Sequence, residues 1–138
     1  MITQDLDILA RTIYGEARGE YGRLDGGLAA LIAVGNVVIN RFKQQTWFGK
    51  TISDVCLKPQ QFSCWNESDP NYAILKSTAI SQPVFLICQD VAQGVVQENW
   101  PDLTRGSDHY HTTDVKPAWA HDKKPIIQIG RHLFYRDC

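Results

Sequence analysis

Two glutamates stand four residues apart in the stretch IYGEARGE at residues 13–20. Glu16 falls at the edge of an apolar helical stripe and close to the predicted end of that helix. Desolvation and the negative end of the helix dipole both favour a protonated carboxyl there, which is the form that a general acid needs. We therefore predict that Glu16 delivers a proton in catalysis, whereas Glu20 is expected to lie beyond the helix and pair with an arginine. The alternative for Glu16 is an ordinary ion pair with Arg11, Arg18 or Arg23.

A second carboxylate would decide which reaction such an acid supports. Hydrolysis of a glycoside by water normally uses two carboxyl groups. Asp25 lies nine residues after Glu16, in a predicted turn, and is the first candidate for the second one. The competing interpretation, which we favour, makes Asp25 the N-cap of the next helix. Asp108 and Asp114 either face a cleft or are ordinary loop residues, and the sequence leaves this open.

The histidines raise the question of a metal. His109 and His111 alternate, so they share one face of an extended segment, and His121 or His132 would have to complete a site. Two histidines without a firm third ligand are weak support for zinc. We expect no metal and no cofactor, and we expect His111 to form hydrogen bonds to sugar or backbone.

The elements that must position these residues are mainly helical. Leu6 to Ala17 follow the i, i+3, i+4 spacing of an amphipathic helix, and residues 28–42 are apolar nearly all round, as in a buried helix. Residues 72–96 predict one or two helices, broken near Pro83. A short extended piece is expected around Tyr110, and residues 126–138 close the chain as a strand or a packed tail. The predicted class is mainly α (α+β), with a loop-rich region and little strand.

Composition limits the classes of function. The chain has 138 residues, of which 43% are hydrophobic and 21% charged, with a net charge of −1. This predicts a single domain over residues 1–138, and the absence of basic character argues against a nucleic-acid partner. No apolar run reaches the roughly 18 residues of a membrane helix. Residues 1–7 lack the basic and apolar regions of a signal peptide.

Four cysteines are present, and four allow three pairings. Cys56 and Cys64 flank one short loop, so we expect a disulfide between them. The alternative is that the cysteines are reduced and buried as small hydrophobic residues.

Five stretches, in order, resemble the SleB/CwlJ family of cell-wall hydrolases. They are IYGEARGE at 13–20, IAVGNVVINR at 32–41, TISDVCLKPQQFSCW at 51–65, GSDHYHTTDVKPAW at 106–119 and IGRHLFYR at 129–136. The resemblance implies a lysozyme-like or lytic-transglycosylase-like fold. It also implies cleavage of the peptidoglycan glycan between N-acetylmuramic acid and N-acetylglucosamine.

The resemblance also assigns roles to residues. The catalytic acid of the family is the first glutamate of the GEARGE block, here Glu16. Its matching neighbours, with His111, are implied to bind substrate or line the site: Asn40, Arg41, Gln61, Phe62, Ser63, Tyr110 and Trp119.

Three functions stay open at this point. A lytic transglycosylase needs only Glu16, because the C6 hydroxyl of muramic acid attacks C1 and leaves a 1,6-anhydro end. A water-using muramidase would use Glu16 with Asp25. A non-catalytic peptidoglycan-binding domain would keep only the fold. In each case we expect a monomer with peptidoglycan as its partner, acting in the periplasm or cell wall. Delivery would depend on a phage holin or another route, or on a leader missing from this sequence.

Overall fold

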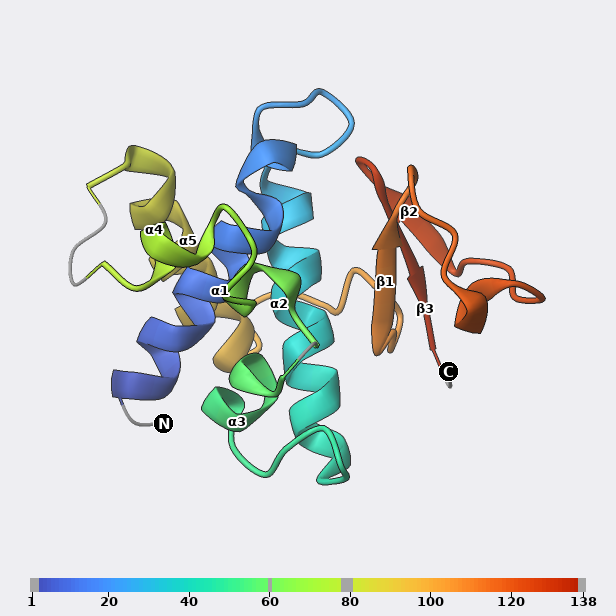
Figure 1. Cartoon of the computed structure of the whole chain (residues 1–138), viewed down its shortest axis with the longest axis horizontal. Coiled ribbons are helices and arrows are strands. Elements are labelled where there is room, and N and C mark those ends of the chain that lie inside the picture. Colours follow the sequence, from blue (N-terminus) through green and yellow to red (C-terminus); the bar gives the residue numbers. More distant parts are fainter. Residues whose placement is uncertain (1–2, 60, 78–80, 137–138) are drawn as a thin grey trace.

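The computed structural model describes residues 3–59, 61–77 and 81–136. Figure 1 shows a body of helices with a small sheet set against one side of it. The predicted class, mainly α with little strand, is confirmed. No helix in the described part of the chain has both the length and the apolar character needed to cross a bilayer.

Two long helices form the centre of the body. α1 (Thr3–Tyr21) buries one stripe that contains Leu9, Ile13 and Ala17, as the spacing predicts. α2 (Gly27–Gln44) is buried on most sides, because apolar residues occur nearly all round it. Gly19 and Gly22 both indicate a helix end in the sequence, and α1 ends at Tyr21, directly before Gly22. The prediction that Glu16 lies in the last turn is therefore wrong, because Glu16 lies more than a turn before the end and Glu20 lies inside the helix.

The remaining helices pack around this pair. α5 (Pro83–Val96) starts with proline at its first turn, where the missing N–H costs nothing, and it contacts both α1 and α2. α3 (Ile52–Leu57) is capped by the Thr51 hydroxyl, which accepts a hydrogen bond from the Asp54 N–H at 3.0 Å. η1 (Ser63–Trp65) and α4 (Tyr72–Leu75) are single turns that pack near α1.

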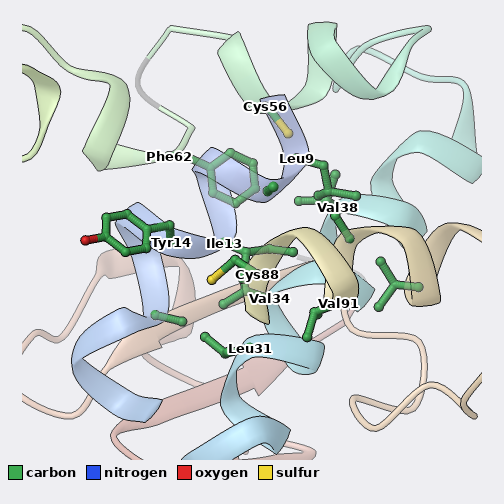
Figure 2. Packing of buried hydrophobic residues seen from close by; sticks show 14 of the residues in the cluster. Leu9, Ile13, Tyr14, Leu31, Val34, Val38, Cys56, Phe62, Cys88 and Val91 are labelled. Atoms are coloured by element: carbon green, nitrogen blue, oxygen red, sulfur yellow. The ribbon is translucent and has the colours of Figure 1, made fainter. Parts of the chain in front are cut away.

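The main core fills the space between these helices. Figure 2 shows side chains from α1, α2, α3 and α5 meeting there, with Phe62 from the loop before η1 packed among them. Phe62 is only 1% exposed, so the prediction that it binds substrate is wrong for its side chain. Its ring instead fixes the loop that carries Gln61, Ser63 and Cys64.

The sheet is antiparallel, with strand order β1-β3-β2. Its strands are β1 (His109–Thr112), β2 (Ile127–Ile129) and β3 (His132–Tyr135). Tyr110 pairs with Phe134, so both side chains lie on the face toward the helices, where Phe134 packs with Ala33 and Val37 of α2. A second, smaller core therefore joins the sheet to α2.

The outer face of the sheet carries a different set of side chains. His109 and His111 do share this face, as their alternation predicts, and Tyr135 lies beside them. Trp119 from the single turn η2 (Ala118–Ala120) packs against all three rings, with centroid distances of 4.9, 5.6 and 5.1 Å. This aromatic cluster covers the outer face of the sheet.

Candidate active site

Glu16 lies in a hollow between the C-terminal half of α1 and the end of the sheet where β1 ends and β3 begins. The hollow has a volume of about 480 Å³, and the Glu16 side chain is half-buried at its wall. Residues from α1, from the loop before α4, and from the ends of β1 and β3 surround it. The residues that line it are Gly15, Glu16, Arg18, Gly19, Glu20, Asn71, Thr112, Thr113, Asp114, Arg131 and His132.

Two donors from distant parts of the chain orient the Glu16 carboxyl group. The backbone N–H of Cys64, in η1, donates to Oε2 at 3.1 Å. The hydroxyl of Tyr110, in β1, donates to Oε1. The side chain therefore has a fixed direction, and both donors stabilise the carboxylate that remains once a proton has been given away.

The close approach of η1 to α1 depends on Gly15. A Cβ atom at this position would lie 2.8 Å from Cβ and 2.9 Å from Sγ of Cys64. On the same side of α1, the Trp65 indole N–H donates to the Thr12 hydroxyl at 2.9 Å. The glycine before Glu16 thus leaves the space that brings the Cys64 N–H to the carboxyl group.

Tyr110 keeps its proton at neutral pH. Burial and then the negative charge of Glu16 raise the pKa of its hydroxyl well above the usual range. Its ring is held on the inner face of the sheet by Phe134, Phe62 and His132, at centroid distances of 5.5, 6.5 and 4.8 Å. Tyr110 is therefore a fixed neutral donor to Glu16, and the substrate contact expected of it stays a prediction.

A buried arginine joins the two segments that hold Glu16. Arg41 is 5% exposed and lies over the rings of Phe48 and Phe62, at 4.8 and 4.9 Å from their centroids. Its Nε donates to the backbone oxygen of Asp108 at 2.7 Å, and its Nη1 donates to Oε1 of Gln61 at 3.4 Å. Arg41 and Gln61 therefore support the loops that lead to Tyr110 and Cys64.

The other predicted site residues lie away from this hollow. The Asn40 amide donates to Asp102 and to the backbone oxygen of Ser107, each at 2.9 Å, so it fixes the loop after α5. Ser63 is exposed at the start of η1. His111 has both ring nitrogens engaged, by the Thr112 carbonyl at 2.7 Å and the Tyr135 hydroxyl at 2.9 Å. Like Trp119, it belongs to the outer cluster of the sheet.

Four other carboxylates differ in burial and in their partners. Glu20 is buried against Arg131, which confirms the expected pairing with an arginine. Asp108 is buried and bonded by Gln44 and His109. Asp114 lines the hollow with Glu16, and its hydrogen bond from Thr112 lowers its pKa. Asp25 is exposed in the loop between α1 and α2.

Asp25 is neither a cap nor part of the hollow. Gly26 holds the N-cap position of α2, without a side-chain cap, so the favoured prediction for Asp25 is wrong. Its carboxylate accepts two hydrogen bonds from Arg23, at 2.9 and 3.0 Å, and this pairing lowers its pKa. The pairing is short-range because only Leu24 separates the two residues.

Asp25→Asn is expected to leave both thermal unfolding and lytic rate nearly unchanged. An exposed ion pair contributes little to stability, and the backbone carbonyl of Asp25 keeps its bond from the Gly130 N–H. Turbidity loss of purified peptidoglycan and a melting curve check this. A stable variant with a lytic rate reduced by more than about tenfold would restore Asp25 as the second carboxylate.

The sequence did not predict several residues that line the hollow, or it singled them out for another role. His132, considered above only as a metal ligand, is 3% exposed, and its Nδ1 has no hydrogen-bond partner among the residues that the structure describes. Burial lowers its pKa, against the charges of Glu20 and Glu16, so the ring is neutral. Arg18 bonds to Asn71 and lies over the Tyr14 ring. Only the block IGRHLFYR gave a signal for His132.

The predicted disulfide is absent. Cys56, Cys64 and Cys88 are free and buried, each in a different part of the helical core, and Cys138 lies outside the described residues. Cys64 lies against Gly15 of α1, while Cys56 points from α3 into the main core (Figure 2). Packing against α1, rather than a bridge, fixes this loop.

The buried thiols should resist alkylation in the folded protein. Burial raises the pKa of Cys56 and of Cys88 to about 12, and it also raises the pKa of Cys64. Because the thiolate is the reactive form, iodoacetamide at pH 8 should label them about a thousandfold more slowly than in urea. Peptide mapping assigns the labels, and rapid labelling of Cys56 or a Cys56–Cys64 bridge would contradict the structure.

Within residues 3–59, 61–77 and 81–136, no group of three His, Cys, Asp or Glu side chains is arranged to hold a metal ion. A half-buried carboxyl group with two fixed donors is an arrangement suited to acid–base chemistry.

Comparison with known proteins places the chain in a family. The model of the Cell Wall Hydrolase family matches residues 27–135, so the chain belongs to this family. The matched region begins after Glu16. The recognised resemblance to cell-wall hydrolases is thereby confirmed.

Three curated relatives are similar to the chain over most of its length. The chain is 26%, 25% and 26% identical to the spore cortex-lytic enzymes of Halalkalibacterium halodurans, Oceanobacillus iheyensis and Bacillus cereus, in each case over 94% of its own length. It spans only 34%, 41% and 43% of the length of these relatives.

The fold is similar to two solved domains. The catalytic domain of the Bacillus cereus SleB protein aligns with a TM-score of 0.71 at 24% identity, covering 96% of this chain and 90% of that one. The catalytic domain of the germination-specific lytic transglycosylase SleB from Bacillus anthracis aligns with a TM-score of 0.69 at 24% identity, covering 97% and 95%.

Proposed function

We propose that this protein cleaves the glycan strand of peptidoglycan between N-acetylmuramic acid and N-acetylglucosamine, in the periplasm or cell wall. The observation that carries the proposal is the Glu16 carboxyl group, held at the hollow by the Cys64 N–H and the Tyr110 hydroxyl. Membership of the Cell Wall Hydrolase family and similarity to spore cortex-lytic enzymes support peptidoglycan as the substrate.

The proposed reaction is that of a lytic transglycosylase. Glu16 protonates the glycosidic oxygen, and the carboxylate that results accepts the proton of the muramic acid C6 hydroxyl as this oxygen attacks C1. The leaving glycan takes the first proton, the ring closes to a 1,6-anhydro end, and no water is consumed. The attacking hydroxyl belongs to the substrate itself, which supplies the proximity that a separate water lacks.

The neighbouring groups fit a reaction with one working carboxyl group. Glu20 is neutralised by Arg131, with Nη2 to Oε2 at 2.6 Å. Tyr110 stays protonated and so keeps Glu16 in place through both proton transfers. His132 also lines the hollow, and its ring is neutral because burial lowers its pKa.

Hydrolysis is the second candidate, with Asp114 rather than Asp25 as its second carboxylate. Asp114 lines the hollow that contains Glu16, is exposed, and is ionised at neutral pH because the Thr112 hydroxyl lowers its pKa. In inverting glycosidases a second carboxylate activates the water that attacks the sugar, and Asp114 shares the hollow with Glu16.

Mass spectrometry of products formed in heavy-oxygen water separates the two reactions. We expect unlabelled 1,6-anhydro ends from wild-type protein and an unchanged product pattern from Asp114→Asn. Labelled reducing ends that disappear in Asp114→Asn would instead establish hydrolysis. Purified protein that released no glycan fragments from peptidoglycan would refute the proposal itself.

A further inference from the structure

Glu20 is buried in the wall of the hollow, one turn beyond Glu16 on α1. It is 4% exposed. Its Oε1 accepts the backbone N–H of Arg131 at 2.6 Å, and its Oε2 accepts Nε and Nη2 of the same residue at 2.8 and 2.6 Å. Burial acts to raise the pKa of Glu20, but the bonds from Arg131 outweigh it and lower the pKa. The carboxylate is thus ionised, with three charge-assisted hydrogen bonds to one turn.

The turn between β2 and β3 is shaped around this carboxylate. Gly130 has a φ of +58°, and a Cβ atom there would lie 2.6 Å from Oε1 of Glu20. Its N–H donates to the Asp25 carbonyl at 2.8 Å, so the turn also meets the loop between α1 and α2. Glycine is required for both the backbone conformation and the close approach.

The same turn determines where one wall of the hollow lies. Arg131 precedes His132, and its carbonyl accepts the N–H of Thr113 at 2.8 Å, which ties in the end of β1. Thr113 and His132 line the hollow opposite Glu16, and the next residue along the inner face of β1 from Thr112 is Tyr110, the donor to Glu16. A shift of the turn would move these groups together.

The rest of the attachment between sheet and helices lies elsewhere. The small core around Phe134 joins the sheet to α2, and Asn40 and Arg41 hold the loop before β1. Beside the hollow, the sheet meets α1 through the bond of Tyr110 to Glu16 and, at the turn between β2 and β3, through the bonds of Arg131 to Glu20. Figure 1 shows the sheet lying to one side of the helical body, with this turn near the loop that follows α1.

We propose that Glu20 is a positioning residue: its contact with the Gly130–Arg131 turn fixes the sheet against α1 and so sets the distance of Tyr110, His132 and Thr113 from Glu16. The two glutamates of GEARGE then have separate tasks, since Glu16 performs the chemistry and Glu20 fixes the opposite wall. This inference rests on the proposed role of Glu16.

Three variants test the contact. Glu20→Gln removes the charge, Arg131→Ala removes the guanidinium but keeps the backbone N–H, and the double variant removes both. We expect each single variant to lower kcat on soluble glycan strands by about 10- to 100-fold, because misplacement of about 1 Å has effects of this size. KM should change little, and the double variant should be no slower than Glu20→Gln. Glu98→Gln, which removes an exposed pair with Lys43, is the matched control.

Hydrogen exchange provides a readout that does not depend on activity. In folded Glu20→Gln and Arg131→Ala, amides of 109–114 and 130–135 should exchange faster, while those of 30–40 in α2 should not. The Arg131 side chain is 51% exposed, so Arg131→Ala is expected to fold even if Glu20→Gln is not.

The outcomes are distinct. The positioning role is wrong if Glu16→Gln is inactive while Glu20→Gln and Arg131→Ala keep kcat within about twofold of wild type. It is also wrong if the loss of kcat in the double variant equals the product of the losses in the two single variants. Unchanged exchange in both variants also overturns it. If wild type cleaves no glycan, or Glu16→Gln keeps its activity, the proposed function fails, and the exchange data alone decide whether Glu20 fixes the sheet.

Discussion

Glu16→Gln is expected to abolish lysis, with a loss of about 10²–10⁴-fold, in a protein that stays folded and still binds peptidoglycan. Glutamine keeps the shape of the side chain, and its carbonyl oxygen can still accept the Cys64 N–H. What it lacks is a proton to give to the glycosidic oxygen and a carboxylate to take one back. The loss should therefore fall on the rate and leave binding and stability largely intact.

Glu67→Gln is the matched control, because Glu67 is an exposed glutamate in the loop after η1 and does not line the hollow. Turbidity loss and chromatography of released fragments give the rate, co-sedimentation with peptidoglycan gives the binding, and circular dichroism gives the fold. Retention of more than about a tenth of the wild-type rate in Glu16→Gln would end its assignment as the acid.

Arg41→Met is expected to lower the free energy of unfolding by about 2–4 kcal/mol, the sum of lost charged hydrogen bonds and cation–π contacts. Methionine preserves the apolar contact with the rings of Phe48 and Phe62. It removes the hydrogen bonds that Arg41 donates to the backbone oxygen of Asp108 and to Oε1 of Gln61. These two residues lead into Tyr110 and Cys64, so lysis should also fall at temperatures where the variant is folded.

Urea denaturation followed by circular dichroism measures the change in stability. Arg23→Met is the control, because Arg23 is an arginine paired with Asp25 at the exposed turn after α1, and its replacement should leave the unfolding midpoint nearly unchanged. If the midpoints of Arg41→Met and Arg23→Met were equal, the buried guanidinium would not stabilise the two loops.

Much of the helical body follows from local patterns in the sequence. The spacing of Leu9, Ile13 and Ala17 determines which face of α1 is buried, and the apolar run of residues 28–42 determines that α2 is central. Pro83 marks the start of α5. These features depend on residues within a turn or two of each other, so their periodicity is visible without the fold. The half-buried position of Glu16 also follows from local spacing, because Glu16 falls at the edge of the same apolar stripe.

The partners of the site residues were decided by tertiary structure alone. Tyr110 is 94 residues from Glu16, and Arg131 is 111 residues from Glu20. Phe62 became core and His111 joined an outer cluster, because the register of β1 with β3 and the packing of the loop on Gly15 fix which face each side chain takes. The same packing brought Asp114, and not Asp25, into the hollow with Glu16. A loop residue has no period that assigns it a face, so its role depends on which distant segment packs against it.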